Sequence, residues 1–172
     1  VDAWTLLHAR HPQWELVIAG PDLEGHAQAL RKRIAALGSE ARITLRGPLY
    51  GVEKWQALAQ AGVFALPTRS ENFGMVIAEA LYAGTPVITT TAAPWRGIVE
   101  RNCGWLAQAE PAALAEVLEV AMVLPDQQRA AMGQRGHAWI AAEYSWDAAG
   151  AAMRAAYGWL LGRAPRPDCV DG

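Results

Sequence analysis

Two glutamates, Glu71 and Glu79, are separated by seven residues, and a Phe-Gly pair at 73–74 lies between them. Apolar runs typical of β-strands flank this segment at 63–66 and 86–89. A strand, a polar turn, a helix and a second strand form half of a nucleotide-binding unit. Free N–H groups and the dipole at the start of such a helix attract phosphate. The pattern therefore predicts a phosphate site with a carboxylate on each side.

The helix of this unit is predicted from 73 to 83. Asn72 is a good N-cap, and Gly84 is a typical end signal before the second strand. Gly74 has no side chain, so a ligand can approach the backbone closely there. We expect the amides of 73–76 to face the phosphate.

Each carboxylate has its own expected ligand. Glu79 lies roughly 7–8 Å along the axis from the expected helix start, about the reach from a diphosphate to the ribose of the same nucleotide. Its two oxygens could accept hydrogen bonds from two neighbouring ribose hydroxyls, and Glu71 could accept them from a hexose. The alternative is that both glutamates are solvated or ion-paired, as most glutamates on helices are.

Composition excludes several classes of protein. With 172 residues, 52% of them hydrophobic and 19% charged, the chain is long enough for one globular domain with a substantial core. A net charge of −2 indicates no nucleic-acid partner. The sequence shows neither a bilayer-spanning apolar stretch nor a signal peptide, and its two cysteines suggest a reducing compartment. We expect a cytoplasmic protein without a metal site, because His8 and His11 have no matching ligand group.

Strand and helix patterns alternate along the chain, which predicts an α/β fold with a doubly wound, parallel, Rossmann-like sheet. We expect one domain at 1–162 and a flexible C-terminal tail at 163–172; the resemblance described next implies that this domain binds a nucleotide-sugar donor. The other predicted elements are a helix end at 4–10, strands at 15–19, 43–45 and 104–106, and helices at 25–37, 52–61, 111–123, 126–143 and 147–161.

Several segments resemble, in the right order, one family of enzymes. The segments are 67–74 (PTRSENFG) with Glu79-Ala80 and 84–87 (GTPV), then 16–22 (LVIAGPD), 43–49 (ITLRGPL), Pro94-Trp95-Arg96, Cys103-Gly104-Trp105 and Tyr144-Ser145-Trp146. Together they resemble the donor-binding C-terminal half of retaining glycosyltransferases of the GT-B fold, of the "group 1" type. The Pro-Trp and Gly-Trp segments resemble a bacterial branch that builds surface polysaccharides.

The resemblance implies a complete enzyme that transfers a hexose from a nucleoside diphosphate sugar to a glycan or lipid-linked acceptor with retention, in lipopolysaccharide or capsule synthesis. It implies no cofactor and no metal, because basic side chains and helix amides neutralise the leaving diphosphate. Peripheral association of the complete enzyme with the inner face of the plasma membrane stays open. Glu71 is the expected catalytic residue, acting by positioning and charge, and the expected donor-binding residues are Gly20, Gly47, Leu49, Asn72, Phe73, Gly74, Met75, Val76 and Glu79.

Family members begin this domain with an earlier strand, followed by an Arg and a Lys that clamp the diphosphate. This chain starts after that point, and the N-terminal acceptor-binding domain is absent from it too. In a doubly wound sheet the first strand is central, so its absence would leave two unpaired inner edges. We expect that the strands close up, that another chain supplies a strand, or that the natural protein has upstream residues. We also expect the chain alone to bind donors weakly and to be inactive.

Four other functions compete with this interpretation. A nucleotide-sugar epimerase or a phosphorylase of the same fold is disfavoured by the Glu-Asn-Phe-Gly turn and the two Trp segments. A non-catalytic nucleotide-sugar-binding module would not need both glutamates. A dinucleotide-binding domain would carry G-x-G-x-x-G where Gly20-Pro21-Asp22 stands.

Overall fold

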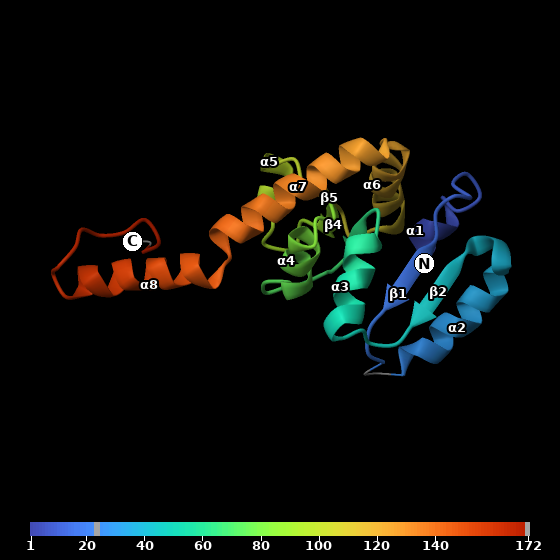
Figure 1. Ribbon diagram of the computed structural model, residues 1–172. Helices are drawn as coiled ribbons and strands as arrows, with labels where there is room; N and C mark the ends of the chain where they lie inside the picture. Colours follow the sequence, from blue (N-terminus) through green and yellow to red (C-terminus); the bar gives the residue numbers. More distant parts are fainter. Residues whose placement is uncertain (23–24, 171–172) are drawn as a thin grey trace.

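The computed structural model describes residues 1–22 and 25–170 and shows alternating strands and helices (Figure 1). The elements in order are α1 (Asp2–Thr5), β1 (Leu16–Ala19), α2 (His26–Leu37), the 3-10 helix η1 (Ser39–Ala41), β2 (Ile43–Arg46), α3 (Gly51–Gln60), β3 (Phe64–Leu66), α4 (Met75–Tyr82), β4 (Val87–Thr90), α5 (Gly97–Glu100), β5 (Gly104–Ala107), α6 (Pro111–Val123), α7 (Asp126–Glu143) and α8 (Trp146–Leu160).

The strands form two parallel sheets, β1–β2 and β3–β4–β5. Leu16 pairs with Ile43 in the first sheet, and Val87 pairs with both Phe64 and Gly104 in the second. The expected α/β fold with parallel strands is confirmed. Within the described ranges β1 and β3 are not paired with each other, so the first of our three expectations, that the strands close up, is wrong.

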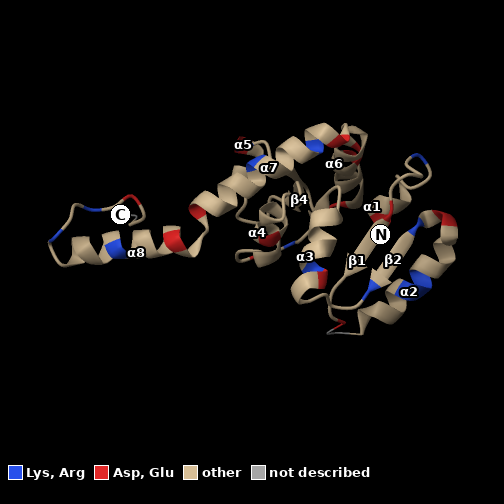
Figure 2. Ribbon diagram, viewed as in Figure 1, with Lys and Arg blue, Asp and Glu red and all other residues tan. Residues whose placement is uncertain are grey.

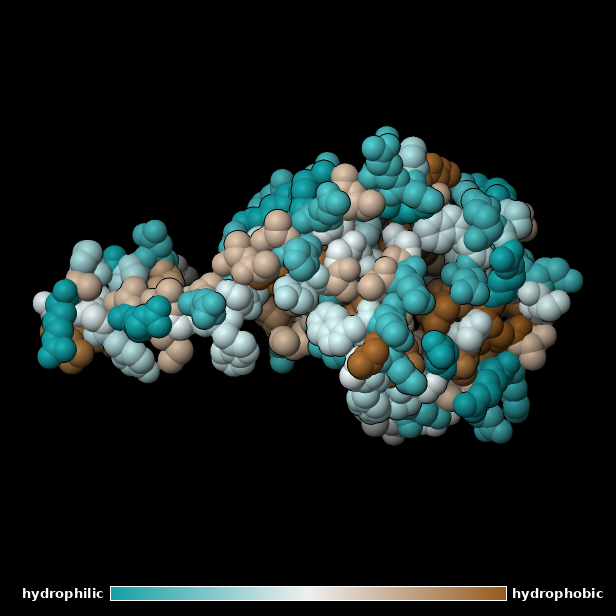
Figure 3. All heavy atoms as spheres, viewed as in Figure 1, coloured by the Kyte–Doolittle hydropathy of each residue, from teal (hydrophilic) through white to brown (hydrophobic). Residues whose placement is uncertain are grey.

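Burial along the strands reflects the division into two sheets. Every residue of β4 is buried, as expected for a central strand covered on both faces. In β1, Leu16 and Ile18 are half-buried, whereas Val17 and Ala19 are exposed. Figure 3 shows hydrophobic side chains at the surface over β1 and β2. The edge of β1 that faces away from β2 therefore keeps unpaired backbone groups.

The larger core lies between β4, α4, α5 and α7. It contains the fully buried side chains of Ile77, Leu81, Val87 and Ile98. Helix α7 crosses α4 closely because it carries glycines there: a Cβ at Gly133 would lie 1.8 Å from a backbone oxygen at the end of α4. The helix that carries Glu79 is thus held rigidly against its own sheet.

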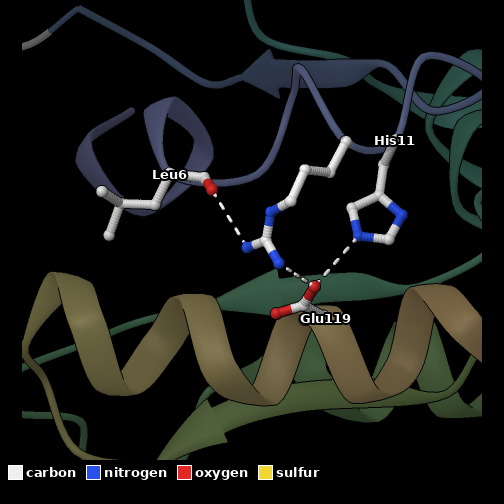
Figure 4. Close-up of polar contacts among 4 residues, drawn as sticks. Leu6, His11 and Glu119 are labelled. Carbon is white, nitrogen blue, oxygen red and sulfur yellow. Dashed lines mark hydrogen bonds and ion pairs between the residues drawn. The ribbon is translucent and has the colours of Figure 1, made fainter.

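A second core joins the N-terminal segment to α6. Trp4 and Leu7 pack on Ala115 and Met122, and the Trp4 indole N–H donates to the Ala41 oxygen at 2.5 Å. Beside this core, Glu119 on α6 accepts a contact from Arg10 and lies 3.5 Å from the His11 Nε2 (Figure 4). Arg10 also donates to the Leu6 oxygen at 3.2 Å.

Some predicted boundaries are wrong. The first helix is one turn, α1, rather than a helix end at 4–10, and neither η1 nor α5 was expected. Helix α8 begins at Trp146, where the Ser145 hydroxyl accepts from the Ala148 N–H at 3.2 Å, and it extends away from the body (Figure 1). The flexible tail at 163–172 stays a prediction, and its last two residues lie outside the described part.

None of the helices in the described ranges has the length and apolar character needed to cross a membrane.

Candidate functional site

The turn between β3 and α4 carries the first glutamate. Helix α4 begins at Met75, two residues later than predicted, and its N-cap is Gly74 with φ +79° and ψ 61°. Asn72 is exposed and does not cap the helix, so that prediction is wrong. Gly74 takes the left-handed conformation that an L-residue avoids, and this turns the chain sharply into α4.

Aromatic side chains explain why the helix starts late. The Trp95 indole N–H donates to the Phe73 carbonyl, and the two rings pack edge to face at 5.2 Å. Phe73 also contacts the Tyr144 ring at 5.9 Å, and the buried Trp95 packs on Trp139 at 5.5 Å. The carbonyl at 73 is thereby committed to a partner outside the helix, and the Gly74 carbonyl is the first that accepts from an N–H of α4.

Threonine hydroxyls hold the other end of the turn. Thr89 donates to the Leu66 oxygen at 2.9 Å, and Thr90 donates to the Thr68 oxygen at 2.5 Å. Thr68 in turn donates to the Ser70 oxygen at 2.7 Å. Strand β4 therefore fixes the turn directly before Glu71. Apart from the two threonines that end β4, no sequence feature predicts these bonds.

The expected phosphate-facing amides come together at the start of α4. The N–H groups of Met75 and Val76 are the first two of the helix and have no intrahelical acceptor. The Ile77 N–H, by contrast, donates to the Gly74 oxygen at 2.8 Å. Within residues 1–22 and 25–170 the amides of Met75 and Val76 have no hydrogen-bond acceptor, so the turn offers them and the positive end of a helix dipole to an anion.

Both glutamates lie beside this helix start. The half-buried Glu71 folds back over the turn, since its Cγ lies 3.2 Å from where a Cβ on Gly74 would be. Glu79 lies in the second turn of α4, roughly 6 Å along the axis from Met75 rather than the expected 7–8 Å. Its Oε1 accepts from the Lys54 ammonium at 2.6 Å. Lys54 is a residue of the site that sequence reasoning missed, because it lies on the preceding helix.

The remaining predicted residues lie in loops at the carboxyl ends of strands. Gly20 follows β1, while Gly47 and Leu49 follow β2. Both glycines are exposed, and a Cβ on either would meet nothing within 4 Å. No hydrogen bond or ring contact within 1–22 and 25–170 joins these loops to the glutamate turn. Their role in donor binding stays a prediction.

The glutamate turn is partly exposed, since Asn72, Phe73 and Met75 are exposed whereas Glu71 and Glu79 are half-buried. Two hollows of about 550 and 360 Å³ lie elsewhere, one between α2 and the β1–β2 sheet and the other beside α6 and α7. Neither includes Glu71, Glu79 or the start of α4. The site therefore consists of a rigid turn, free amides and two carboxylates, an arrangement suited to a ligand with a central diphosphate.

Comparisons with known proteins identify the family and the fold of the chain. Residues 1–139 match the family model for group 1 glycosyl transferases. The chain is 34% identical over 145 residues to a D-inositol 3-phosphate glycosyltransferase of Streptomyces scabiei, covering 82% of this chain and 32% of the relative. It is 33% identical over 140 residues to a GDP-mannose-dependent alpha-(1-6)-phosphatidylinositol monomannoside mannosyltransferase of Mycobacterium tuberculosis, covering 77% and 35%.

The fold is similar to that of HepE from Anabaena, solved in complex with UDP. The TM-score is 0.71 at 24% identity, over 93% of this chain and 44% of the other. The chain thus spans about a third of the length of the curated relatives described above.

Proposed function

Since the chain belongs to the group 1 glycosyltransferase family, we propose that it binds the nucleoside diphosphate sugar from which the complete enzyme transfers a hexose with retention. One observation carries this proposal. Glu71, the free amides at the start of α4 and Glu79 follow one another along a single rigid unit. Their order matches the order of hexose, diphosphate and ribose in such a donor.

Each part of the unit has a distinct role in the proposed reaction. The amides of Met75 and Val76 stabilise the diphosphate as its charge grows on leaving. Glu71 accepts hydrogen bonds from the hexose and favours the positive charge that develops on the sugar ring. Glu79 accepts hydrogen bonds from the ribose. Gly20, Gly47 and Leu49 line the remainder of the nucleotide.

The names of the relatives support a nucleotide-sugar donor more strongly than any one acceptor. The mannosyltransferase of Mycobacterium tuberculosis is named for GDP-mannose and for a lipid acceptor, whereas the Streptomyces scabiei enzyme is named for an inositol phosphate. We therefore propose a glycan or lipid-linked acceptor in general. A place in lipopolysaccharide or capsule synthesis rests only on the Pro94-Trp95 resemblance.

Transfer assays on the complete enzyme test these roles. We expect Glu71→Ala to lower kcat at least tenfold, since it removes a charged acceptor worth about 1.5–3 kcal/mol. We expect Glu79→Gln to raise the KM for the donor. Glu110→Ala is a matched control, because this exposed residue lies before α6, away from the turn. A Glu71→Ala enzyme that kept most of its kcat would show that the hexose role is wrong.

Metal dependence is a separate part of the proposal. The amides and basic side chains supply the charge that neutralises the diphosphate, so we expect EDTA to leave the transfer rate unchanged. Loss of activity on chelation, restored by a divalent cation, would contradict this part alone.

A further inference from the structure

We propose that Lys54 is a positioning residue, which holds the Glu79 carboxylate in the orientation that accepts the ribose hydroxyls of the donor. The inference rests on the proposed function, because it deepens the role given to Glu79. Neither the family match nor the names of the relatives assigns a role to this lysine.

The contact between the two side chains is short and partly shielded from water. Lys54 Nζ lies 2.6 Å from Glu79 Oε1, and the side chains are 32% and 23% exposed. An ion pair at the open surface contributes little and moves freely. A pair that is about three-quarters buried on the carboxylate side is screened less and keeps a defined geometry.

The helix that carries Lys54 is itself fixed against α4. Figures 1 and 2 show α3 beside α4, with charged residues on both helices. At the C-terminal end of α3, the buried Thr85 hydroxyl donates to the Leu58 oxygen at 2.6 Å. In the middle, the Trp55 and Tyr82 rings pack edge to face at 6.1 Å. The lysine therefore extends from a fixed backbone toward Glu79.

The ammonium is restrained on a second side too. Lys54 Nζ lies 5.5 Å from the centre of the Trp55 ring, within the range of a cation–π contact. Two restraints on one ammonium reduce the number of rotamers that the lysine can adopt. A restrained lysine can act as a fixed support for the carboxylate.

The pair leaves one carboxylate oxygen for a ligand. Lys54 occupies Oε1 of Glu79, and within the described part of the chain no hydrogen-bond donor reaches Oε2. A carboxylate has about four lone-pair sites, so a ribose diol can still donate to it while the lysine stays in place. Helix α3 also follows directly the loop of Gly47 and Leu49. Lys54 thus lies on the helix that follows the proposed nucleotide-lining loop and contacts the proposed ribose acceptor.

The test compares a ribonucleotide with its dideoxyribose counterpart, which lacks both hydroxyls. Calorimetric titration of the complete natural enzyme with UDP, GDP and ADP first selects the tightest nucleoside diphosphate. The ratio of the two Kd values then measures recognition of the ribose diol alone. In the unsubstituted enzyme we expect a preference for ribose of about tenfold or more, typical of a hydrogen bond to a charged group.

The variants are Lys54→Met, Lys54→Gln, Lys54→Arg, Glu79→Gln and, as a control, Lys32→Met. Lys32 is the chain's other lysine and lies exposed on α2. We expect Lys54→Met and Lys54→Gln to reduce the ribose preference at least threefold. Lys54→Arg should keep most of the preference, and Lys32→Met should keep all of it. Thermal melts identify any variant that fails to fold.

Different failures point to different errors. If Glu79→Gln kept the ribose preference, the proposed ribose role would be wrong and the lysine inference would fall with it. If Glu79→Gln abolished the preference while both neutral Lys54 variants kept it, only the positioning role would be wrong. Tighter binding of the ribonucleotide after loss of Lys54 would also overturn the inference, because the lysine would then compete with the ribose.

Discussion

Replacing Gly74 by alanine tests the link between the backbone of the turn and donor binding. Gly74 has φ +79°, which an alanine adopts at a cost. The added Cβ would also lie 2.9 Å from Ile77 Cδ1 and 3.2 Å from Glu71 Cγ. Ile77 is fully buried and has little room to move, so the strain falls partly on Glu71.

The expected loss in the free energy of unfolding follows from the backbone conformation and the close contacts at Gly74. The left-handed backbone costs an alanine about 1–2 kcal/mol, and overpacking against a buried side chain adds about 1–3 kcal/mol. Gly84→Ala is the matched control at the other end of α4. Its φ is +82°, but its Cβ would meet nothing within 4 Å, so only the backbone cost of about 1–2 kcal/mol applies.

Urea denaturation measures the free energy of unfolding of both variants, and calorimetry measures their affinity for the donor nucleotide. We expect Gly74→Ala to be less stable than Gly84→Ala by at least about 1 kcal/mol. We also expect it to lose about tenfold or more in affinity for the sugar nucleotide, since Glu71 and the adjacent amides are displaced. Equal stability of the two variants would show that the added Cβ at Gly74 is not overpacked. Unchanged affinity in Gly74→Ala would show that donor binding does not depend on the backbone of this turn.

Four further predictions concern the support of the site, the two cysteines and the open edge of β1. Trp95→Phe keeps an aromatic ring but removes the N–H that donates to the Phe73 carbonyl and leaves part of the buried indole volume empty, so it should lower the free energy of unfolding by at least about 1–2 kcal/mol; an unchanged urea midpoint would contradict this. Burial raises the pKa of the Cys103 thiol to about 11, and its folded value therefore lies above its unfolded value of 9.0. The neutral thiol is favoured in the fold, so stability should fall by up to about 2–3 kcal/mol as the pH rises from about 9 to 11, and Cys103→Ala should weaken that fall. At about pH 8, iodoacetamide should modify the exposed Cys169 well before Cys103, and equal rates would be evidence against a buried thiol. In the isolated 172-residue chain, amides of β4 should exchange hydrogen more slowly than those of β1, because β4 is paired on both edges and β1 on one; equal protection would mean that a strand covers the open edge of β1.

Local sequence signals predicted some elements to the residue. Helices α6 and α7 have the predicted bounds, 111–123 and 126–143, because Pro111 occupies the first turn of one and Pro125 directly precedes the other. Helix α2 begins after Gly25 and ends before Gly38, which both have positive φ. At these places local proline and glycine residues decide where the helix begins or ends.

Tertiary contacts decided the parts that the sequence could not predict. Asn72 is the better N-cap by type, but the Phe73 carbonyl accepts from Trp95, and Gly74 is the N-cap of a helix that begins at Met75. Lys54 lies 25 residues before Glu79, and only the packing of α3 on α4 brings them together. The spacing and the family resemblance together make the two glutamates candidates for the site, whereas the contacts that support them could not be predicted from the sequence.

Binding of the donor to the β3–α4 turn can be observed by an NMR titration of the complete enzyme with isotope-labelled phenylalanine. The 172 residues contain two phenylalanines, Phe73 in the turn and Phe64 in β3, and Phe73→Leu assigns the first signal. We predict that UDP or GDP shifts the Phe73 amide, that the hexose conjugate shifts it further at lower concentration, and that Phe64 moves less. If the Phe73 signal stayed in place when the enzyme was saturated with the donor, the β3–α4 turn would not be the donor site.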